Sequence, residues 1–180
     1  IDLNLQDFKK RVNSDLVGKV INIASRSASF VVKKYNKQLS AKCIERPLYD
    51  EFVEAGSDIA KHYEARNFSK AMRLIMKLAD KANQYIDEKK PWQLAKIEGK
   101  EKEVHEITSL AINLFKVLII YLKPVLPEMA KSSEEFLNVD SLNWSDIESP
   151  LTNHKINKFK ALMTRIEDEQ IDQMVESSKI

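Results

Sequence analysis

Apolar side chains recur at steps of three and four residues along nearly every long segment of this 180-residue sequence. This spacing places them on one side of an α-helix, where they pack against a core. Only three Gly residues interrupt a composition rich in Leu, Ile, Ala, Lys and Glu, which favours helices over strands and turns. We therefore predict an all-α fold: a helix bundle of about five main helices, in a single domain over residues 1–180.

Local start and stop signals set the boundaries of the expected helices. Asn67 is a suitable N-cap, and Pro91 ends the helix before it because proline lacks the amide hydrogen needed to continue. Residues 138–157 are expected to form a loop that Trp144 and Leu151 hold against the core. The expected helices cover residues 4–12, 17–35, 47–66, 67–90, 103–122, 129–137 and about 158–180.

Residues 110–122 form the most hydrophobic run of the chain. A membrane-spanning helix needs about 20 mostly apolar residues. This run is shorter and contains Asn113 and Lys116. We therefore expect a central core helix and no membrane partner.

Charge is unevenly distributed along the chain. The net charge is only +2, but residues 1–100 carry a net +7 and residues 101–180 a net −5. A partner that bears phosphates would prefer the first part. An uneven solvated surface is the alternative interpretation.

The N-terminal sequence and the single cysteine bear on compartment. Cys43 cannot form an internal disulfide, and nothing at the N-terminus resembles a signal peptide, so we expect a cytoplasmic location. The chain begins with Ile1 rather than Met, which suggests a piece of a longer protein.

Residues that could carry catalysis are scattered. His62, His105 and His154 have no Cys, His or Asp partner at a metal-ligand spacing, so we expect no metal site. The sequence has no Gly-rich phosphate loop and no nucleophile elbow, so an active site of its own is not expected. The acid pairs Asp87–Glu88 and Glu134–Glu135 are interpreted as solvated faces.

The polar side of the helix expected over residues 17–35 is a candidate binding surface. Asn22 and Arg26 lie one turn apart and project from one side. An amide and a planar guanidinium suit the edges and phosphates of unpaired nucleotides. A merely solvated helix face is the alternative.

Trp92 follows directly after the predicted helix end at Pro91. An exposed Trp at such an elbow is a stacking platform for a nucleotide base. Large aromatic residues after a helix end more often pack back onto the helix, so the residues alone favour a core Trp.

Four groups of residues then occur in a characteristic order. They are 22–26 (NIASR), 87–92 (DEKKPW), 112–115 with 121–127 (INLF and YLKPVLP), and 159–162 with 165–166 (FKAL and RI). Together they resemble the anticodon-binding domain of bacterial methionyl-tRNA synthetase over nearly the whole chain. They resemble its class I relatives for valine, isoleucine, leucine or cysteine less.

The resemblance implies a helix bundle that follows a catalytic domain and reads the CAU anticodon of methionine tRNA. Asn22 and Arg26 match the family's anticodon-contacting residues, and Pro91 and Trp92 match its stacking Trp and the preceding Pro. Trp92 is then expected to stack on the first anticodon base, which reverses the interpretation as a core residue. Lys33, Lys89 and Lys90 are candidate phosphate contacts.

The family's nucleotide-binding signatures, HIGH and KMSKS, and its zinc-knuckle cysteines are absent from the chain. We therefore expect the aminoacylation centre, with ATP and optionally zinc as cofactors, to lie outside this chain, which holds no cofactor and is inactive alone. The helix at residues 158–180 resembles the segment that packs back toward the catalytic domain. Two alternatives are a helical scaffold for protein contacts and an independent enzyme.

Overall fold

The computed structural model describes residues 12–159, and the regular elements within that range are all helical. The all-α prediction is confirmed. The helices predicted over 4–12 and 158–180 lie almost entirely outside the described residues. The elements are the π-helix η1 (Val12–Val17), α2 (Gly18–Lys34), α3 (Arg46–Glu54), α4 (Gly56–Glu64), α5 (Phe68–Lys89), α6 (Pro91–Leu94), α7 (Glu101–Leu122), α8 (Pro127–Leu137) and the 3-10 helix η2 (Trp144–Glu148).

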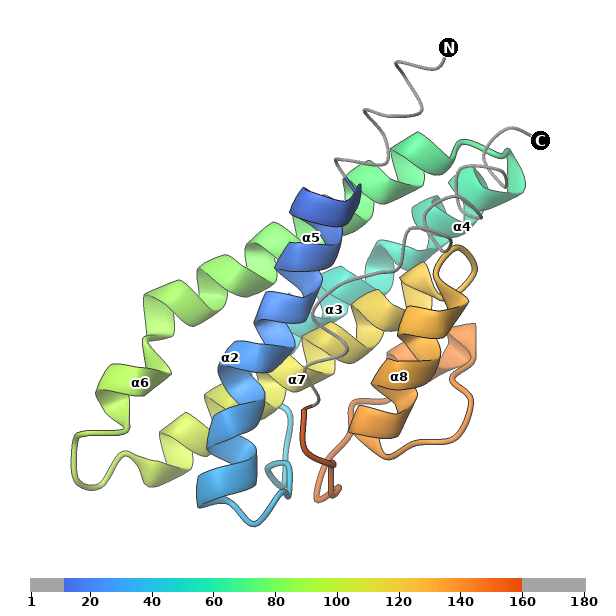
Figure 1. The fold of residues 1–180 in the computed structure, drawn as a ribbon. Helices are drawn as coiled ribbons and strands as arrows, with labels where there is room; N and C mark the ends of the chain where they lie inside the picture. The colour runs from blue at the N-terminus through green and yellow to red at the C-terminus, as the bar shows by residue number, and fades with distance from the viewer. Residues whose placement is uncertain (1–11, 160–180) are drawn as a thin grey trace.

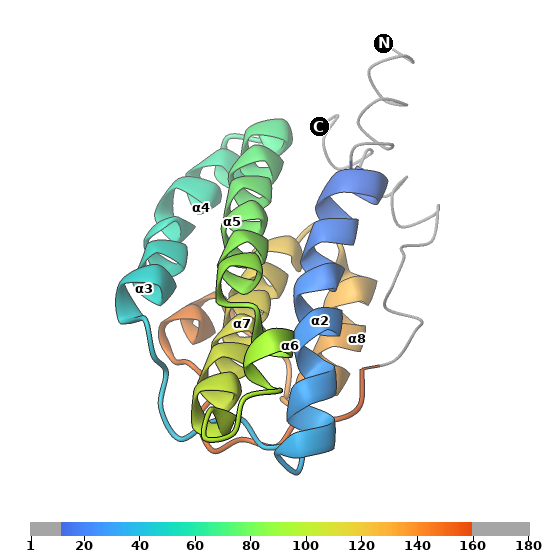
Figure 2. The ribbon, with the colours of Figure 1, turned by 90° about the vertical axis from the view of Figure 1, so that its left-hand side faces the viewer.

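Helix α7 is the centre of the bundle. Figures 1 and 2 show it enclosed by α2, α5, α3 and α8. Every residue from Ile107 to Leu122 is buried. By length and composition α7 could cross a membrane, but 89% of its apolar window is buried inside the bundle. The prediction of a core helix is confirmed.

The single helix predicted over residues 47–66 is wrong, because the chain breaks at Ala55 into α3 and α4. Tyr121 of α7 contacts the chain at this break. Its hydroxyl donates to the carbonyl of Phe52 at 2.6 Å, so that carbonyl is used outside the helix. Gly56 makes room for the ring, since a Cβ there would lie 2.9 Å from the Tyr121 hydroxyl oxygen.

The segment after α8 is held against α7 by polar side chains of that helix. The amide of Asn113 donates to the carbonyl of Leu151 at 3.0 Å and accepts from its N–H at 2.6 Å. The Nζ of Lys116 donates to the carbonyl of Ser149. The Trp144 ring lies 5.0 Å from that of Tyr121. Trp144 and Leu151 therefore anchor this segment, as predicted.

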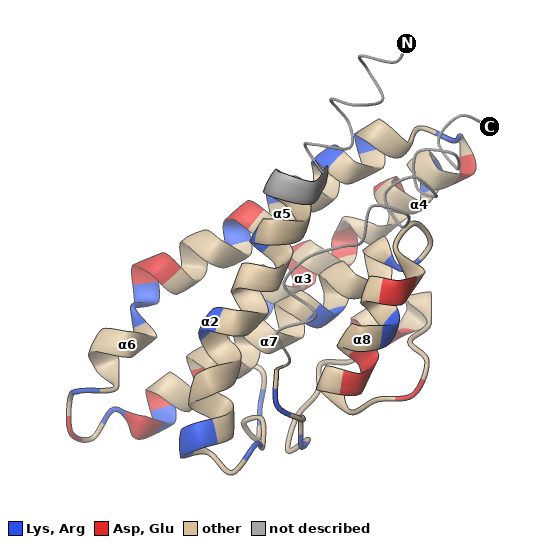
Figure 3. Cartoon of the chain, viewed as in Figure 1, with Lys and Arg blue, Asp and Glu red and all other residues tan. Residues whose placement is uncertain are grey.

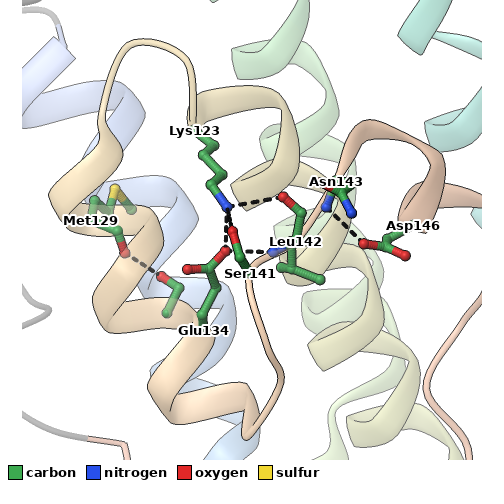
Figure 4. Close-up of polar contacts among 8 residues, drawn as sticks. Lys123, Met129, Glu134, Ser141, Leu142, Asn143 and Asp146 are labelled. Carbon is green, nitrogen blue, oxygen red and sulfur yellow. Dashed lines mark hydrogen bonds and ion pairs between the residues drawn. The ribbon is translucent and has the colours of Figure 1, made fainter.

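Glu134 is not the solvated acid predicted from the sequence. Its side chain is only 12% exposed, and its Oε2 lies 2.6 Å from the Nζ of Lys123. Figure 4 shows that Lys123 also donates to Ser141 and to the carbonyl of Leu142. The Leu142 N–H donates to Glu134 at 2.7 Å. This network fixes the chain where it leaves α8, and it arises because Lys123 lies across the α7–α8 turn from Glu134.

Candidate nucleic-acid interface

Helices α2 and α5 run parallel and are joined by three polar pairs on their exposed edge. Partners in every pair are 61 residues apart, so the two helices stay in register over about two turns. This register brings the end of α5 beside the middle of α2. The pairs are Lys19 Nζ with Asp80 Oδ1 at 2.6 Å, Asn22 Nδ2 with Asn83 Oδ1 at 3.2 Å, and Arg26 Nη2 with Asp87 Oδ1 at 2.5 Å.

Asn22 occupies the middle of this edge and is exposed. Its amide nitrogen donates to Asn83, whose own amide donates to the carbonyls of Lys19 and Ala79 at 3.0 and 3.2 Å. Among the described residues the amide oxygen of Asn22 has no hydrogen-bond partner. Asn22 is thus held in position by α5 and retains an acceptor that faces solvent.

Arg26 contacts Trp92 where this edge reaches the C-terminal end of α5. The Arg26 guanidinium carbon lies 5.1 Å from the centroid of the Trp92 ring, a cation–π arrangement. The ion pair with Asp87 holds the guanidinium from its other side. The Arg26 side chain is 23% exposed and that of Asp87 is 64% exposed. The fork of donors is therefore positioned but open to solvent on part of its edge.

The turn between α5 and α6 presents Trp92 to solvent. Lys90 adopts a left-handed backbone conformation with φ of 49°, which ends α5 and redirects the chain into α6. Pro91 is buried at the first position of α6, and Trp92 is 38% exposed. The interpretation of a core Trp, based on residues alone, is wrong. Pro91 is the residue of this turn that is buried against the bundle. Helix α6 is only four residues long, and Trp92 on it stays partly exposed.

The three lysines suggested as phosphate contacts lie at this end of the bundle in two groups. Lys89 and Lys90 flank the α5–α6 turn, and the Lys89 Nζ lies 5.9 Å from the centroid of the Tyr85 ring. Lys33 is exposed in the last turn of α2, about 10 Å along the helix axis from Arg26. The structure thus brings together Arg26, Trp92 and the lysines of the turn, with Lys33 further away.

The contacts of two residues of this surface are missing from the sequence interpretation. Asp87 is exposed, in agreement with its interpretation as a solvated acid, but it also forms an ion pair with Arg26. Asn83 is not singled out there at all, although it orients Asn22. Each partner is 61 residues distant, so the local sequence holds no signal for either contact.

A cavity between the end of α2 and the start of α7 contains two ring side chains that are already bound to the backbone. It has a volume of about 600 Å³ and includes Tyr35 and His105, whose rings stack at 4.0 Å. The Tyr35 hydroxyl donates to the carbonyl of Glu101, and His105 Nε2 lies 2.6 Å from the carbonyl of Gln38. Burial, and then the charge of Glu101, raise the pKa of Tyr35, so its hydroxyl stays protonated.

The sequence matches the model of a known protein family. The sequence model of the anticodon binding domain of methionyl tRNA ligase matches residues 38–178. The methionine–tRNA ligase of Vesicomyosocius okutanii is 64% identical over 179 residues, which are 99% of this chain and 33% of that protein. The methionine–tRNA ligase of Psychrobacter cryohalolentis is 56% identical over 99% of this chain and 26% of its own length.

The fold is similar to part of a solved structure. Mycobacterium tuberculosis methionyl-tRNA synthetase in complex with methionyl-adenylate superposes with a TM-score of 0.75 at 18% identity, over 87% of this chain and 32% of that one. At that identity the likeness concerns the fold alone. The chain spans between a quarter and a third of the length of the curated relatives it matches.

Proposed function

The chain belongs to the family of anticodon-binding domains of methionyl-tRNA ligases, and from that membership we propose that it recognises the CAU anticodon loop of methionine tRNA. The observation that carries the proposal is the placement of Arg26 over a partly exposed Trp92. An aromatic ring and a planar guanidinium are the groups on which unpaired bases stack and to which their edges bond.

In the proposed complex the loop is splayed and its first base, cytosine, stacks on the exposed part of the Trp92 ring. Base stacking on an aromatic contributes on the order of 1–3 kcal/mol per base. Arg26 and Asn22 bond the base edges and neighbouring phosphates, with the free amide oxygen of Asn22 as an acceptor. Pro91 acts as the buried first residue of α6, which fixes the backbone from which Trp92 projects.

Lys89 and Lys90 add attraction to the loop phosphates that is independent of sequence, with Lys33 as a more distant contact. Their contribution falls as salt rises, whereas the stacking contribution persists.

The same proposal places this domain beside the catalytic domain of a methionine–tRNA ligase in the cytoplasm. ATP and any zinc would bind in that domain, and no group of three metal-ligating side chains occurs within residues 12–159. This chain supplies anticodon recognition and no chemical step of its own.

A fluorescence titration tests the proposal. The chain contains two Trp residues, so a Trp144→Phe background isolates the signal of Trp92. Trp144 packs between Tyr121 and Tyr63, and Phe retains the aromatic contact. An RNA stem-loop with the CAU anticodon is added at near-physiological salt, and loops with single-base changes serve as controls.

Saturable quenching that is lost when the first anticodon base is changed would support the proposal. Equal quenching by every loop would contradict specific recognition and leave general RNA binding. No change in Trp92 fluorescence would contradict the stacking role and favour a scaffold for protein contacts.

A further inference from the structure

Helices α4 and α5 form a second surface of distinct chemistry, away from Arg26. A groove of about 350 Å³ is lined by His62 of α4 and by Lys70, Arg73, Leu74 and Lys77 of α5. We call it the basic groove. Three of its five side chains are the cationic Lys70, Arg73 and Lys77, and none is acidic. The half-buried Leu74 and the aliphatic stems of the long side chains form its floor.

The cations of the basic groove are not neutralised by the described part of the chain. Within residues 12–159, Lys70, Arg73 and Lys77 form no ion pair, and all three are exposed. The C-terminal half of α5 differs, because three of its five charged residues, Asp80, Lys81 and Asp87, have an ion-pair partner among the described residues. Figure 3 shows the same change along α5, from basic positions only near its start to mixed charge further on.

The cations of the basic groove lie on α5, the helix that leads into α6 and Trp92. Lys70, Arg73 and Lys77 recur at steps of three and four, so they form one stripe along α5. Figure 2 shows the outer face of α5 and the helix α6 turned toward the same viewer. At 1.5 Å per residue, Lys77 lies about 15 Å along the axis from Asp87, and Lys70 about 25 Å. The groove is thus a fixed distance from the proposed anticodon site.

We propose that the basic groove binds the sugar-phosphate backbone of the RNA stem that leads into the anticodon loop. The inference rests on the proposed function, because it takes the loop to be bound at Trp92 and the stem to run back along α5 to the groove. A double-stranded stem presents phosphates and 2′-hydroxyls and hides most of its base edges. Exposed Lys and Arg in a row match that surface, position the RNA and read no sequence.

The test compares two triple variants of the chain with the same change in charge. Lys70→Gln, Arg73→Gln and Lys77→Gln remove the cations of the basic groove. Lys131→Gln, Lys155→Gln and Lys158→Gln are the matched control, since these lysines are also exposed and lie on α8 and the segment that follows η2. Thermal unfolding of both variants, like that of the parent chain, checks that folding is preserved.

The probes are CAU stem-loops with a long and a shortened stem, and the same long stem with a changed first anticodon base. The groove variant is expected to lose about tenfold in affinity for the long stem, and its slope of log K against log salt falls by about 2 to 3 for three lost phosphate contacts. The loss is equal for the CAU and the changed loop, and it is small for the shortened stem. A charge-retaining variant, Lys70→Arg with Arg73→Lys and Lys77→Arg, is expected to bind like the parent chain.

Two affinity measurements could overturn the inference. It would be wrong if the groove and control variants bound the long stem equally well, or if the groove variant lost as much affinity for the shortened stem as for the long one. Loss of discrimination between the two loops in the groove variant would also contradict it, because phosphate contacts read no base. These measurements also distinguish a failure of the groove proposal from a failure of the proposed anticodon recognition. If the parent chain ignores the anticodon base while the groove variant still loses affinity for the long stem, the groove would be supported and CAU recognition refuted.

Discussion

The Nη2 of Arg26 on α2 lies 2.5 Å from the Oδ1 of Asp87 on α5, and the same guanidinium covers the Trp92 ring at 5.1 Å. The carboxylate and the aromatic ring thus hold one arginine between two elements. A pair this exposed contributes at most about 1 kcal/mol to stability. Its more important effect is to restrict the directions in which the guanidinium can offer its remaining donors.

Asp87→Ala separates positioning from stability. The variant is expected to unfold within a few degrees of the parent chain, because the ion pair is exposed. Its discrimination between a CAU loop and a loop with a changed first base is expected to fall about tenfold, or about 1.4 kcal/mol. The affinity for the changed loop should not fall, since removal of an acid reduces repulsion of phosphate. Fluorescence titration of Trp92 measures both affinities.

Glu88→Ala is the matched control for that prediction. Glu88 is the neighbouring acid, is exposed and forms no ion pair within the described range. It removes the same charge without releasing Arg26, so discrimination should persist. An equal loss in the two variants would show that charge alone, and not the position of Arg26, controls recognition.

Arg26→Lys keeps the charge and removes the planar fork of donors. An ammonium cannot bond two acceptors in the same plane, nor lie flat on the Trp92 ring as a guanidinium does. We expect the CAU preference to fall by about tenfold, while the salt dependence of binding is unchanged because the charge is retained. CAU binding as tight as that of the parent chain would remove Arg26 from recognition.

The elements that could be predicted from the sequence are those whose start, end and buried face are encoded by neighbouring residues. The long helices α5 and α7 were predicted to within two residues, because an N-cap, a proline and a continuous apolar stripe lie within the segments themselves. At the break between α3 and α4, the Phe52 carbonyl binds the Tyr121 hydroxyl, which lies 69 residues away in the sequence. No pattern within residues 47–66 reports that contact.

The candidate site shows the same limit. Asn22 and Arg26 could be selected because they share a helix turn, and Pro91 because of its effect on the backbone. Their partners Asn83 and Asp87 required the parallel register of α2 and α5, which no local spacing encodes. The exposure of Trp92 followed from the family resemblance, whereas residue statistics favoured burial.

Lys116 provides a test by pH. Burial lowers its pKa from 10.5 to about 8, partly offset by the charge of Asp146. Between about pH 8 and 10.5 the unfolded chain holds a proton that the folded chain has released. The contribution of this group to the free energy of unfolding therefore rises with pH across that window. Below pH 8 the buried charge is a cost to the folded state.

Lys116→Met removes that charge and keeps the length of the side chain. The Ser149 carbonyl that Lys116 binds belongs to an exposed residue, where water can replace the bond. The variant is expected to be at least as stable as the parent chain at pH 7, and its advantage is expected to shrink by pH 9.5. Urea unfolding at the two pH values measures the difference, with the exposed Lys131→Met as a control. A stability difference that is the same at both pH values would contradict the lowered pKa.

Gly56→Ala tests whether the close packing of Tyr121 at the break between α3 and α4 requires glycine. An added Cβ would lie 2.9 Å from the Tyr121 hydroxyl oxygen and 3.1 Å from Cδ1 of Ile147. Both contacts are with well-packed groups, so we expect a loss of about 1–3 kcal/mol in the free energy of unfolding. This loss exceeds the gain of about 0.5–1 kcal/mol that Ala normally provides over Gly in a helix.

Gly18→Ala is the matched control, because Gly18 is also helical and a Cβ there meets nothing within 4 Å. It should leave the chain as stable or slightly more stable. Tyr121→Phe removes the atom nearest to the new Cβ and costs about 1 kcal/mol by itself through the lost hydrogen bond to Phe52. The double variant Gly56→Ala with Tyr121→Phe is then expected to be more stable than the sum of the two single changes, since they act on one contact. Additive losses in thermal or urea unfolding would show that the hydroxyl of Tyr121 does not require glycine at position 56.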